Sequence, residues 1–419
     1  MSRITNVTVR NSLAVFLVGA AVTISIIVGA AHLDGDRARA HVVEAVESSA
    51  LATGAYRDIE LIPGLVVMES DNFSTCVMLS QMFGPAESVF GEGIWGTEPG
   101  DGCAQAYAAI AGEPSVPTTW YRYWHGASAI GKVLLTGLPF LAVQILLTVV
   151  VALLVAVISW RVWRYSKALG LGFAITLSVA SDVLWHGLSL VHGITAAIGL
   201  SGVLAILIAF ERRWSARWGV VLLAGFTYAA TAQMLIPIAF AILSATVAML
   251  PLLADKPSKF GPWTGLAVGV GWIMGYVFGL LSRYIWVSTL GPGAAQLSEI
   301  SGTSQIYLTQ TLIQPFHATL GLLMKTWLGV GWMQIGLIAV GGTIGWILAR
   351  GGSRNLLRKD TLIAATPVLF GIGWLVVWAG HTNHTFVNVL LASMLVSVLF
   401  TIDYARHRVG CVSGSTNSV

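Results

Sequence analysis

Two carboxylates form the first arrangement in this chain that could support chemistry. Glu69 and Asp71 lie two residues apart, shortly before the apolar residues 77–79. Such a pair can ionise unequally, which leaves one carboxylate able to act as a general base. Asp71 is therefore a candidate catalytic base, with Glu69 beside it. The alternatives are a solvated acidic turn, which is the more common role of such a pair, and an Asp71 side chain that caps the following helix.

A dense aromatic and basic run forms a second candidate site. It contains Arg122, Tyr123, Trp124 and His125, and Lys132 follows soon after. The rings could stack on a sugar or an isoprenoid chain, while the basic groups donate hydrogen bonds to a phosphate at the level of the lipid headgroups. The alternative is an ordinary aromatic belt with an arginine that extends to the interface.

Further polar residues fall in short connections and at helix edges. Ionisable groups near membrane depth are costly unless they are paired or functional, so Asp182 is a candidate for substrate binding. Histidines there could join loop carboxylates in a site for a divalent cation or a phosphate, although no spacing is specific for a metal. A single histidine is more often an ordinary interfacial residue. The remaining candidates in this group are His186, His192, Arg283, His381, Asn383 and His384.

Hydrophobic segments are the elements that must position these residues. The chain has 419 residues, of which 56% are apolar and only 10% charged, and its mean hydropathy is +0.78. A helix needs roughly 20 apolar residues to cross about 30 Å of hydrocarbon. The sequence therefore predicts an all-α fold, a polytopic membrane bundle with about ten spanning helices. The expected spans are 12–32, 136–159, 168–185, 193–210, 218–233, 236–254, 262–282, 328–349, 361–379 and 386–403.

The distribution of basic residues predicts the orientation of the bundle. With the N-terminus inside, 16 of the 23 lysines and arginines fall in inner segments, as expected because these residues resist translocation. Both termini, including the tail 404–419, are then cytoplasmic, and eight of the nine histidines lie at the outer boundary. Region 1–32 holds the N-terminus and the first helix, and its segment 12–32 could instead be a cleaved secretory signal, because small residues occur at 29–31. Its apolar run is longer than a typical signal core, which favours a retained first helix.

The first outer loop, 33–128, is the largest polar segment. It holds 13 acidic and four basic residues, and such a surface disfavours nucleic acid as a partner. Apolar stretches between its polar ones predict short helices that lie against the membrane. Cys76 and Cys103 both lie in this loop, where an oxidising exterior favours a disulfide between them. The alternative, metal ligation, lacks the C-x-x-C spacing.

Region 129–403 holds the other nine helices and a second outer segment, 284–327. Apolar residues at spacings of three and four within this segment predict an amphipathic helix that rests on the bilayer. It could gate the lateral entry of a lipid, and a packed re-entrant segment is an equal alternative. Soluble-enzyme motifs such as a P-loop, H-E-x-x-H or G-x-S-x-G are absent from the sequence.

This layout resembles the GT-C class of polyprenyl-phosphate-sugar glycosyltransferases. That class has many spanning helices, and an acidic residue early in its large first outer loop acts on the acceptor. Asp71, with Glu69 beside it, matches the acidic position, although the paired Asp-Asp form of the motif is absent. Segment 284–327 looks like the later outer loop that shapes the lipid-donor pocket. The Arg-Tyr-Trp-His-Gly run at 122–126 also looks like one found in bacterial membrane proteins, which implies the inner membrane of a bacterium.

The resemblance implies a glycosyltransferase that moves a sugar from a polyprenyl-phosphate donor to a cell-envelope acceptor on the outer face. Asp71 would deprotonate the acceptor, and Arg122, His125, Lys132 or Arg283 would stabilise the phosphate leaving group. Membrane lipids, the donor and the acceptor are the expected partners, and a divalent cation is the cofactor that the histidines could hold. Two alternatives stay open. One is a transporter or flippase for an anionic lipid or small solute, and the other is a non-catalytic subunit of an envelope complex.

Overall fold

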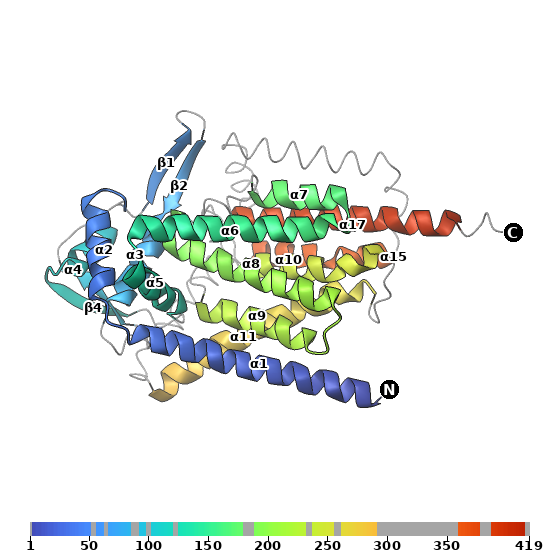
Figure 1. Cartoon of the computed structure of the whole chain (residues 1–419), viewed down its shortest axis with the longest axis horizontal. Helices are drawn as coiled ribbons and strands as arrows, with labels where there is room; N and C mark the ends of the chain where they lie inside the picture. The colour runs from blue at the N-terminus through green and yellow to red at the C-terminus, as the bar shows by residue number, and fades with distance from the viewer. Residues whose placement is uncertain are drawn as a thin grey trace.

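Long helices determine the shape of the molecule. The computed structural model describes residues 2–51, 56–62, 66–84, 92–97, 102–119, 125–178, 188–231, 237–254, 261–290, 359–377 and 387–414. The long helices run along its longest axis, and short elements from residues 36–137 gather at one end, which we call the cap (Figure 1). The start of α1 (Ser2–Ala31) and the end of α17 (Val387–Gly414) both lie at the opposite end (Figure 1).

Among the described residues, six helices are long and apolar enough to cross a membrane. Besides α1 and α17 they are α6 (Phe140–Trp163), α8 (Leu190–Glu211), α10 (Pro237–Met249) with its 3-10 continuation η3 (Leu250–Ala254), and α11 (Trp263–Leu290). Each overlaps a span expected from the sequence. The chain is therefore a multi-pass helical membrane protein.

The other expected spans are only partly covered by the described residues. The shorter helices α7 (Lys167–Ser178), α9 (Arg217–Thr231), α15 (Lys359–Ala364) and α16 (Thr366–Val377) overlap the expected spans 168–185, 218–233 and 361–379. The expected span 328–349 lies outside the described residues. The count of about ten spans thus stays a prediction.

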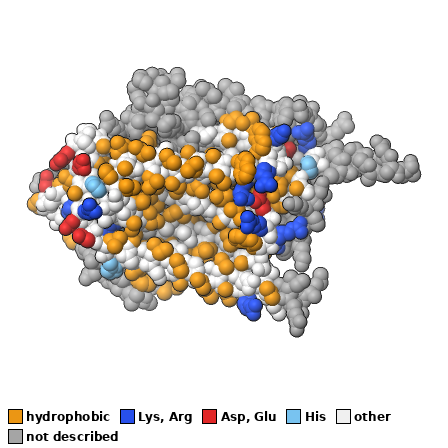
Figure 2. Space-filling view, in the orientation of Figure 1, with side chains coloured by type: hydrophobic (Ala, Val, Ile, Leu, Met, Phe, Trp, Pro, Cys, Tyr) orange, Lys and Arg blue, Asp and Glu red, His pale blue; other side chains and the backbone are white. Residues whose placement is uncertain are grey.

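The bundle has a buried centre and an apolar rim. Every residue of α10 is buried, as expected for a helix that is apolar all round and packs against α8, α11 and α17. α1 and α6 instead expose large apolar side chains, among them Leu17, Val22, Leu141 and Leu153. Figure 2 shows a broad belt of apolar side chains between the cap and the opposite end. An exposed apolar surface of this extent is the surface that meets lipid.

Two glycines set the spacing of α9 and α11. A Cβ added at Gly275 of α11 would lie 2.8 Å from the carbonyl carbon of Leu222 and 3.0 Å from its Cα. A Cβ at Gly225 of α9 would lie 2.8 Å from the backbone nitrogen of Tyr276. Small residues let membrane helices approach backbone to backbone, where van der Waals packing holds them together.

The described part of the cap combines four short helices with two antiparallel strand pairs. The helices are α2 (Asp36–Glu47), α3 (Asn72–Met82), α4 (Gly102–Ile110) and α5 (Gly126–Gly137). β1 (Tyr56–Ile62) pairs with β2 (Val66–Asp71), and β3 (Glu92–Gly96) pairs with β4 (Ser115–Thr119). Short helices were expected in loop 33–128, but the strands were not. The alternation of polar and apolar residues at 58–61 is the signal that could have indicated β1.

A separate helix stands between the aromatic run and the second spanning helix. The sequence placed that span at 136–159, directly after the run, whereas the structure ends α5 at Gly137 and begins α6 at Phe140. Leu138 between them is extended, with φ −138° and ψ 144°. The following Pro139 explains this, because a residue before proline avoids helical backbone angles. The aromatic run therefore leads into the cap helix α5.

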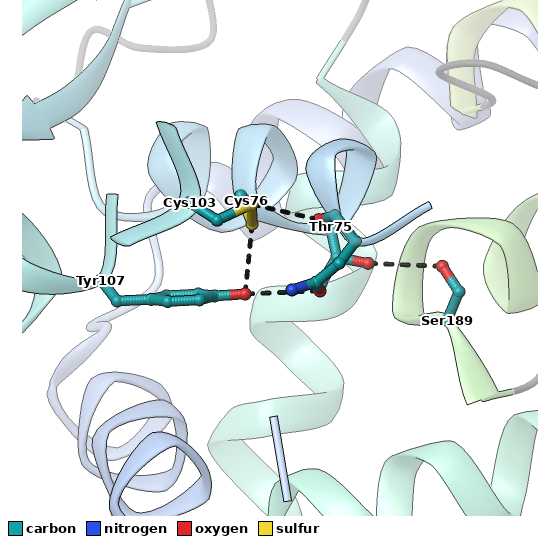
Figure 3. Close-up of a disulfide and its surroundings, with 6 residues drawn as sticks. Thr75, Cys76, Cys103, Tyr107 and Ser189 are labelled. Atoms are coloured by element: carbon teal, nitrogen blue, oxygen red, sulfur yellow. Dashed lines mark hydrogen bonds between the residues drawn. A yellow bond between two sulfur atoms is a disulfide. The ribbon is translucent and has the colours of Figure 1, made fainter. Parts of the chain in front are cut away.

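A disulfide joins α3 and α4, as expected from the sequence. Cys76 and Cys103 are bonded, their Cα atoms lie 5.2 Å apart, and neither residue is exposed (Figure 3). The hydroxyl of Tyr107 lies 3.2 Å from Cys76 Sγ and 3.4 Å from Asn72 Oδ1, within reach as a donor to either (Figure 3). The disulfide is thus part of a buried contact between two cap helices.

Gly275→Ala should destabilise the bundle by about 1–3 kcal/mol, because the new methyl group overlaps backbone atoms that cannot rotate away. The thermal unfolding midpoint of the detergent-purified protein measures the effect. Gly29→Ala in α1 is the matched control, since nothing lies within 4 Å of a Cβ at that position. Equal midpoints for Gly275→Ala and the unmodified protein would contradict the packing of α9 against α11.

Cys76→Ala combined with Cys103→Ala should lower the stability of the cap by about 3 kcal/mol, because the bond closes a loop over 27 residues. The rate of limited proteolysis within residues 33–128 reports this loss. Cys411→Ala, which removes the third cysteine, is the control and should leave the rate unchanged. A double variant as resistant as this control would show that the disulfide does not hold the cap.

Candidate functional site

An open pocket lies where α1, α3 and α5 meet. The space between its walls is about 290 Å³, part of which is open to solvent. Its walls are apolar on the side of α1 and polar on the side of α5, so it borders both the lipid-facing helix and the cap. The lining residues are Ile27 and Ala31 from α1, Gln81 and Met82 from α3, and His125, Ser128, Ala129 and Lys132 from α5.

The helical periodicity of α5 brings its polar residues to this pocket. His125 precedes the first residue of the helix, and Ser128 and Lys132 follow at spacings of three and four. Residues at these spacings lie on one face of a helix. Gly126 allows α5 to start close to the end of α9, because a Cβ there would lie 2.8 Å from the Cα of Thr231. The backbone of α9 thus fixes the position of His125.

A buried hydrogen bond joins α3 to α5 at the pocket. Ser128 Oγ donates to Gln81 Oε1 at 2.9 Å, and both side chains are buried. A buried polar pair is stable only when such bonds are made, so the pair fixes the register of the two helices. The sequence analysis did not identify Ser128 or Gln81. The spacing of Ser128 from His125 and Lys132 was the available signal for the serine, whereas no local pattern points to Gln81.

Lys132 connects the pocket to the end of α1. Its Nζ donates to the backbone oxygen of Ala31 at 3.0 Å, which satisfies a carbonyl at the C-terminus of that helix. Burial lowers the pKa of Lys132 below its ordinary value, and the carboxylate of Asp34 opposes this effect. The ammonium group is therefore partly desolvated, in the position where a bound anion would stabilise it.

Arg283 lies within a helix and not at its outer edge. The sequence ended this span at 282 and began an outer segment at 284, whereas α11 continues to Leu290 and Arg283 is fully buried. Gly279, one turn earlier, packs against Ala229 and Phe226 of α9. Arg283 thus follows α11 toward the same end of α9 that contacts Gly126. The remainder of the predicted segment 284–327 lies outside the described residues.

Glu69 and Asp71 lie just before the start of α3, at the end of this helix opposite the pocket. Both belong to β2, where Glu69 is paired with Asp58 and Asp71 with Tyr56, and only their backbone positions are described. Asp71 directly precedes α3, so its backbone is about 15 Å from that of Gln81 along the helix, at 1.5 Å per residue. The candidate base and the pocket are therefore at opposite ends of α3.

His192 lies near the same end of α3 as Asp71. The hydroxyls of Thr75 and Ser189 lie 3.3 Å apart, which places the start of α8 beside the start of α3 (Figure 3). His192 is buried in the first turn of α8. Apart from Arg283, the described candidates thus form two groups. His125 and Lys132 share the pocket, whereas Glu69, Asp71 and His192 gather around the start of α3.

Several predicted site residues lie outside the described residues. They are Arg122, Tyr123, Trp124, Asp182, His186, His381, Asn383 and His384. Within the part of the chain that the structure describes, no group of three or more His, Cys, Asp or Glu residues could hold a metal ion. Two other histidines bond to the backbone: His32 Nδ1 lies 2.8 Å from the oxygen of Val28, and His41 Nδ1 lies 2.7 Å from that of Leu135.

Helix α1 is integrated into the bundle. Asn11 Nδ2 donates to Ser215 Oγ at 3.0 Å, and the hydroxyls of Thr23 and Thr227 lie 3.3 Å apart. At its other end α1 supplies Ala31 to the pocket. Helix α1 thus contributes both to the bundle and to one wall of the pocket.

Comparison with known proteins adds no assignment. No protein-family model matches this sequence, and no curated protein or solved structure is similar enough to count as a match. The function is therefore argued from the residues of the site.

Lys132 should make the stability of the cap depend on pH. Between its lowered folded-state pKa and the ordinary value of 10.5, the unfolded chain binds more protons than the folded chain. The free energy of unfolding should therefore rise with pH through this window. Denaturation midpoints measured in steps up to pH 10.5 should show the rise, and Lys132→Gln should flatten it. Lys359→Gln, at an exposed lysine of α15, is the control and should keep the rise. An unchanged slope in Lys132→Gln would contradict the desolvation of the Lys132 ammonium group.

Proposed function

We propose that this chain is a membrane glycosyltransferase that takes a sugar from a polyprenyl phosphate and transfers it to a cell-envelope acceptor on the outer face. The pocket between α1, α3 and α5 is the observation that carries the proposal. An ammonium, an imidazole, an amide and a hydroxyl group line it beside the end of a lipid-facing helix. We further propose that the cap faces the outside of a bacterial inner membrane and that both termini are cytoplasmic.

The polar side of the pocket suits a phosphate group. Lys132 is a point charge whose pKa is lowered by burial, so an anion beside it would offset the cost of desolvation. His125 on the same helix face adds an imidazole group that can donate a further hydrogen bond, whereas the Ser128 hydroxyl already donates to Gln81 Oε1. A phosphate bound there would give the Lys132 ammonium a directly bonded anion, in addition to the electrostatic effect of Asp34.

The apolar side of the pocket suits a lipid chain. Ile27 and Ala31 line the pocket, and α1 exposes Val18, Val22 and Ile26 on another side, about 100–180° around the helix from the two lining residues. From Ala31 to Val18 the helix rises about 20 Å, which covers much of the hydrocarbon depth of a bilayer. A polyprenyl tail would pass around α1 from the pocket to this exposed side while its phosphate occupies the pocket.

In the proposed reaction, Asp71 takes the proton of the acceptor hydroxyl. The acceptor oxygen then bonds to the anomeric carbon, and the bond from that carbon to the phosphate oxygen breaks, with the electron pair leaving on the phosphate. Lys132 and His125 would stabilise the charge that develops there. Asp71 precedes α3 and the pocket lies about 15 Å away at the other end of this helix, whereas the reacting carbon is bonded directly to the phosphate. Transfer therefore requires a movement that brings Asp71 within hydrogen-bond reach of an acceptor bound beside the pocket.

A buried cation supports a second candidate function. Arg283 is fully buried in the spanning helix α11, and ionisable residues inside a membrane bundle often mark the path of a charged substrate. A transporter or flippase for an anionic lipid or solute would use it in this way. Such a protein moves its substrate across sealed vesicles without covalent change, whereas the transferase forms a glycosylated product on one side.

Lys132→Gln should weaken binding of undecaprenyl phosphate in nanodiscs by about tenfold, because the pocket loses its only described cation. Native mass spectrometry counts the bound lipid. Asp71→Asn should leave this binding intact and reduce sugar transfer in membranes by about 10²–10⁴-fold, as expected for a general base. Lys359→Gln and Glu113→Gln are the matched controls for binding and transfer.

If Lys132→Gln binds the lipid as well as the unmodified protein does, the pocket is not the phosphate site. If Asp71→Asn transfers sugar as fast as the unmodified protein does, Asp71 is not the general base. Passage of unmodified lipid across sealed vesicles, with no product in any variant, would favour the transporter.

A further inference from the structure

An ion pair joins two helix ends at the end of the bundle that lies opposite the cap. Arg161 in the last turn of α6 bonds to Glu211, the last residue of α8. The hydroxyl of Tyr165 also bonds to Glu211, and burial together with this carboxylate raises the pKa of Tyr165 to about 12. Glu211 is thus fully engaged by α6 and by the turn that follows it.

Three further arginines surround this ion pair and stay exposed. Arg164 follows α6 directly, and Arg212 and Arg213 follow α8. Among the described residues, no carboxylate lies within 4.0 Å of these three guanidinium groups. Figure 2 shows the basic side chains gathered at this end, next to the margin of the apolar belt. The three arginines therefore carry positive charge that the described protein does not neutralise.

Exposed tryptophans lie among these arginines. Trp160 is 59% exposed, and Trp163 and Trp214 are each 43% exposed. The guanidinium carbon of Arg164 lies 5.7 Å from the centre of the Trp160 ring. Tryptophan concentrates at the level of lipid headgroups, where its apolar ring and its polar N–H face different surroundings. These rings thus mark the depth at which the arginines meet a membrane surface.

We propose that Arg164, Arg212 and Arg213, with Trp160, Trp163 and Trp214, form a binding surface for the headgroups of anionic phospholipids. The phosphodiester would accept hydrogen bonds from the guanidinium groups, and the acyl chains would lie along the exposed apolar face of α6, which includes Leu153 and Val157. A lipid fits this surface better than an acidic soluble protein, because the arginines border the apolar belt directly.

Helix ends offer a purely structural explanation for the same arginines. Cations near the C-termini of α6 and α8 interact favourably with the helix dipoles, whatever lipid surrounds them. That explanation predicts equal effects of charge removal in neutral and anionic lipid. The proposal instead predicts that the effects depend on anionic lipid, and this difference separates the two.

Purified protein should be titrated in detergent with phosphatidylglycerol and, separately, with phosphatidylcholine, and bound lipids counted by native mass spectrometry. The unmodified protein should prefer phosphatidylglycerol, and each arginine near the headgroup should contribute about fivefold to this preference. Arg212→Gln with Arg213→Gln should reduce the preference by about 25-fold, and adding Arg164→Gln should abolish it. Arg37→Gln, an exposed arginine of the cap, is the matched control.

Circular dichroism of each variant establishes that its helices are intact. If the triple variant is unstable, the double variant, which changes only exposed residues, provides the test. A preference retained in the double variant, or absent from the unmodified protein, would overturn the proposal. Displacement of bound phosphatidylglycerol by millimolar glycerol phosphate would also overturn it, because the surface would then recognise a free phosphate. This test does not involve the pocket at the cap, so its outcome is independent of the proposed transferase activity.

Discussion

The interior of a bilayer supplies no water to bond with backbone N–H and C=O groups, and this constraint orders the whole molecule. Long helices satisfy their own backbone groups within the apolar belt, whereas the strands β1–β4 and the short helices α2–α5 belong to the cap. The carbonyls at the end of α1 become unsatisfied where that helix reaches the cap. Lys132 bonds to one of them, so the residue that completes α1 is also the cation of the pocket.

The pocket depends on contacts between segments that are distant in the sequence. The disulfide from Cys76 to Cys103 fastens α3 to α4, and the bond from Ser128 to Gln81 fastens α3 to α5. Gly126 lets α5 contact the end of α9, which also packs along α1 and α11. The pocket therefore joins the cap to the membrane bundle. The basic surface at the far end, in contrast, is built from adjacent helix ends alone.

Hydropathy predicted the membrane class and the six long spans, because each spanning helix shows its apolar run directly in the sequence. The disulfide was also predictable, since only Cys76 and Cys103 share a loop. The break at Leu138–Pro139 lies at the edge of a continuous apolar stretch, so hydropathy placed only the span 136–159 there and did not predict α5 as a separate helix. The burial of Arg283 and the placement of Asp71 and Lys132 at opposite ends of α3 depend on tertiary packing, which spacing along the chain does not encode. That further histidines gather near the pocket or near the start of α3 stays a prediction.

The pairing of α1 with α9 has a consequence for biogenesis. Asn11 and Thr23 bond to Ser215 and Thr227, each 204 residues later in the chain. Ribosomes add about 5–20 residues per second, so α1 is complete on the order of 10–40 s before its partner is synthesised. During that interval its hydroxyl and amide groups face lipid or the insertion machinery. Helix α1 is thus complete well before its neighbour α9 (Arg217–Thr231), so the contacts between these two helices form only after the middle of the chain has been made.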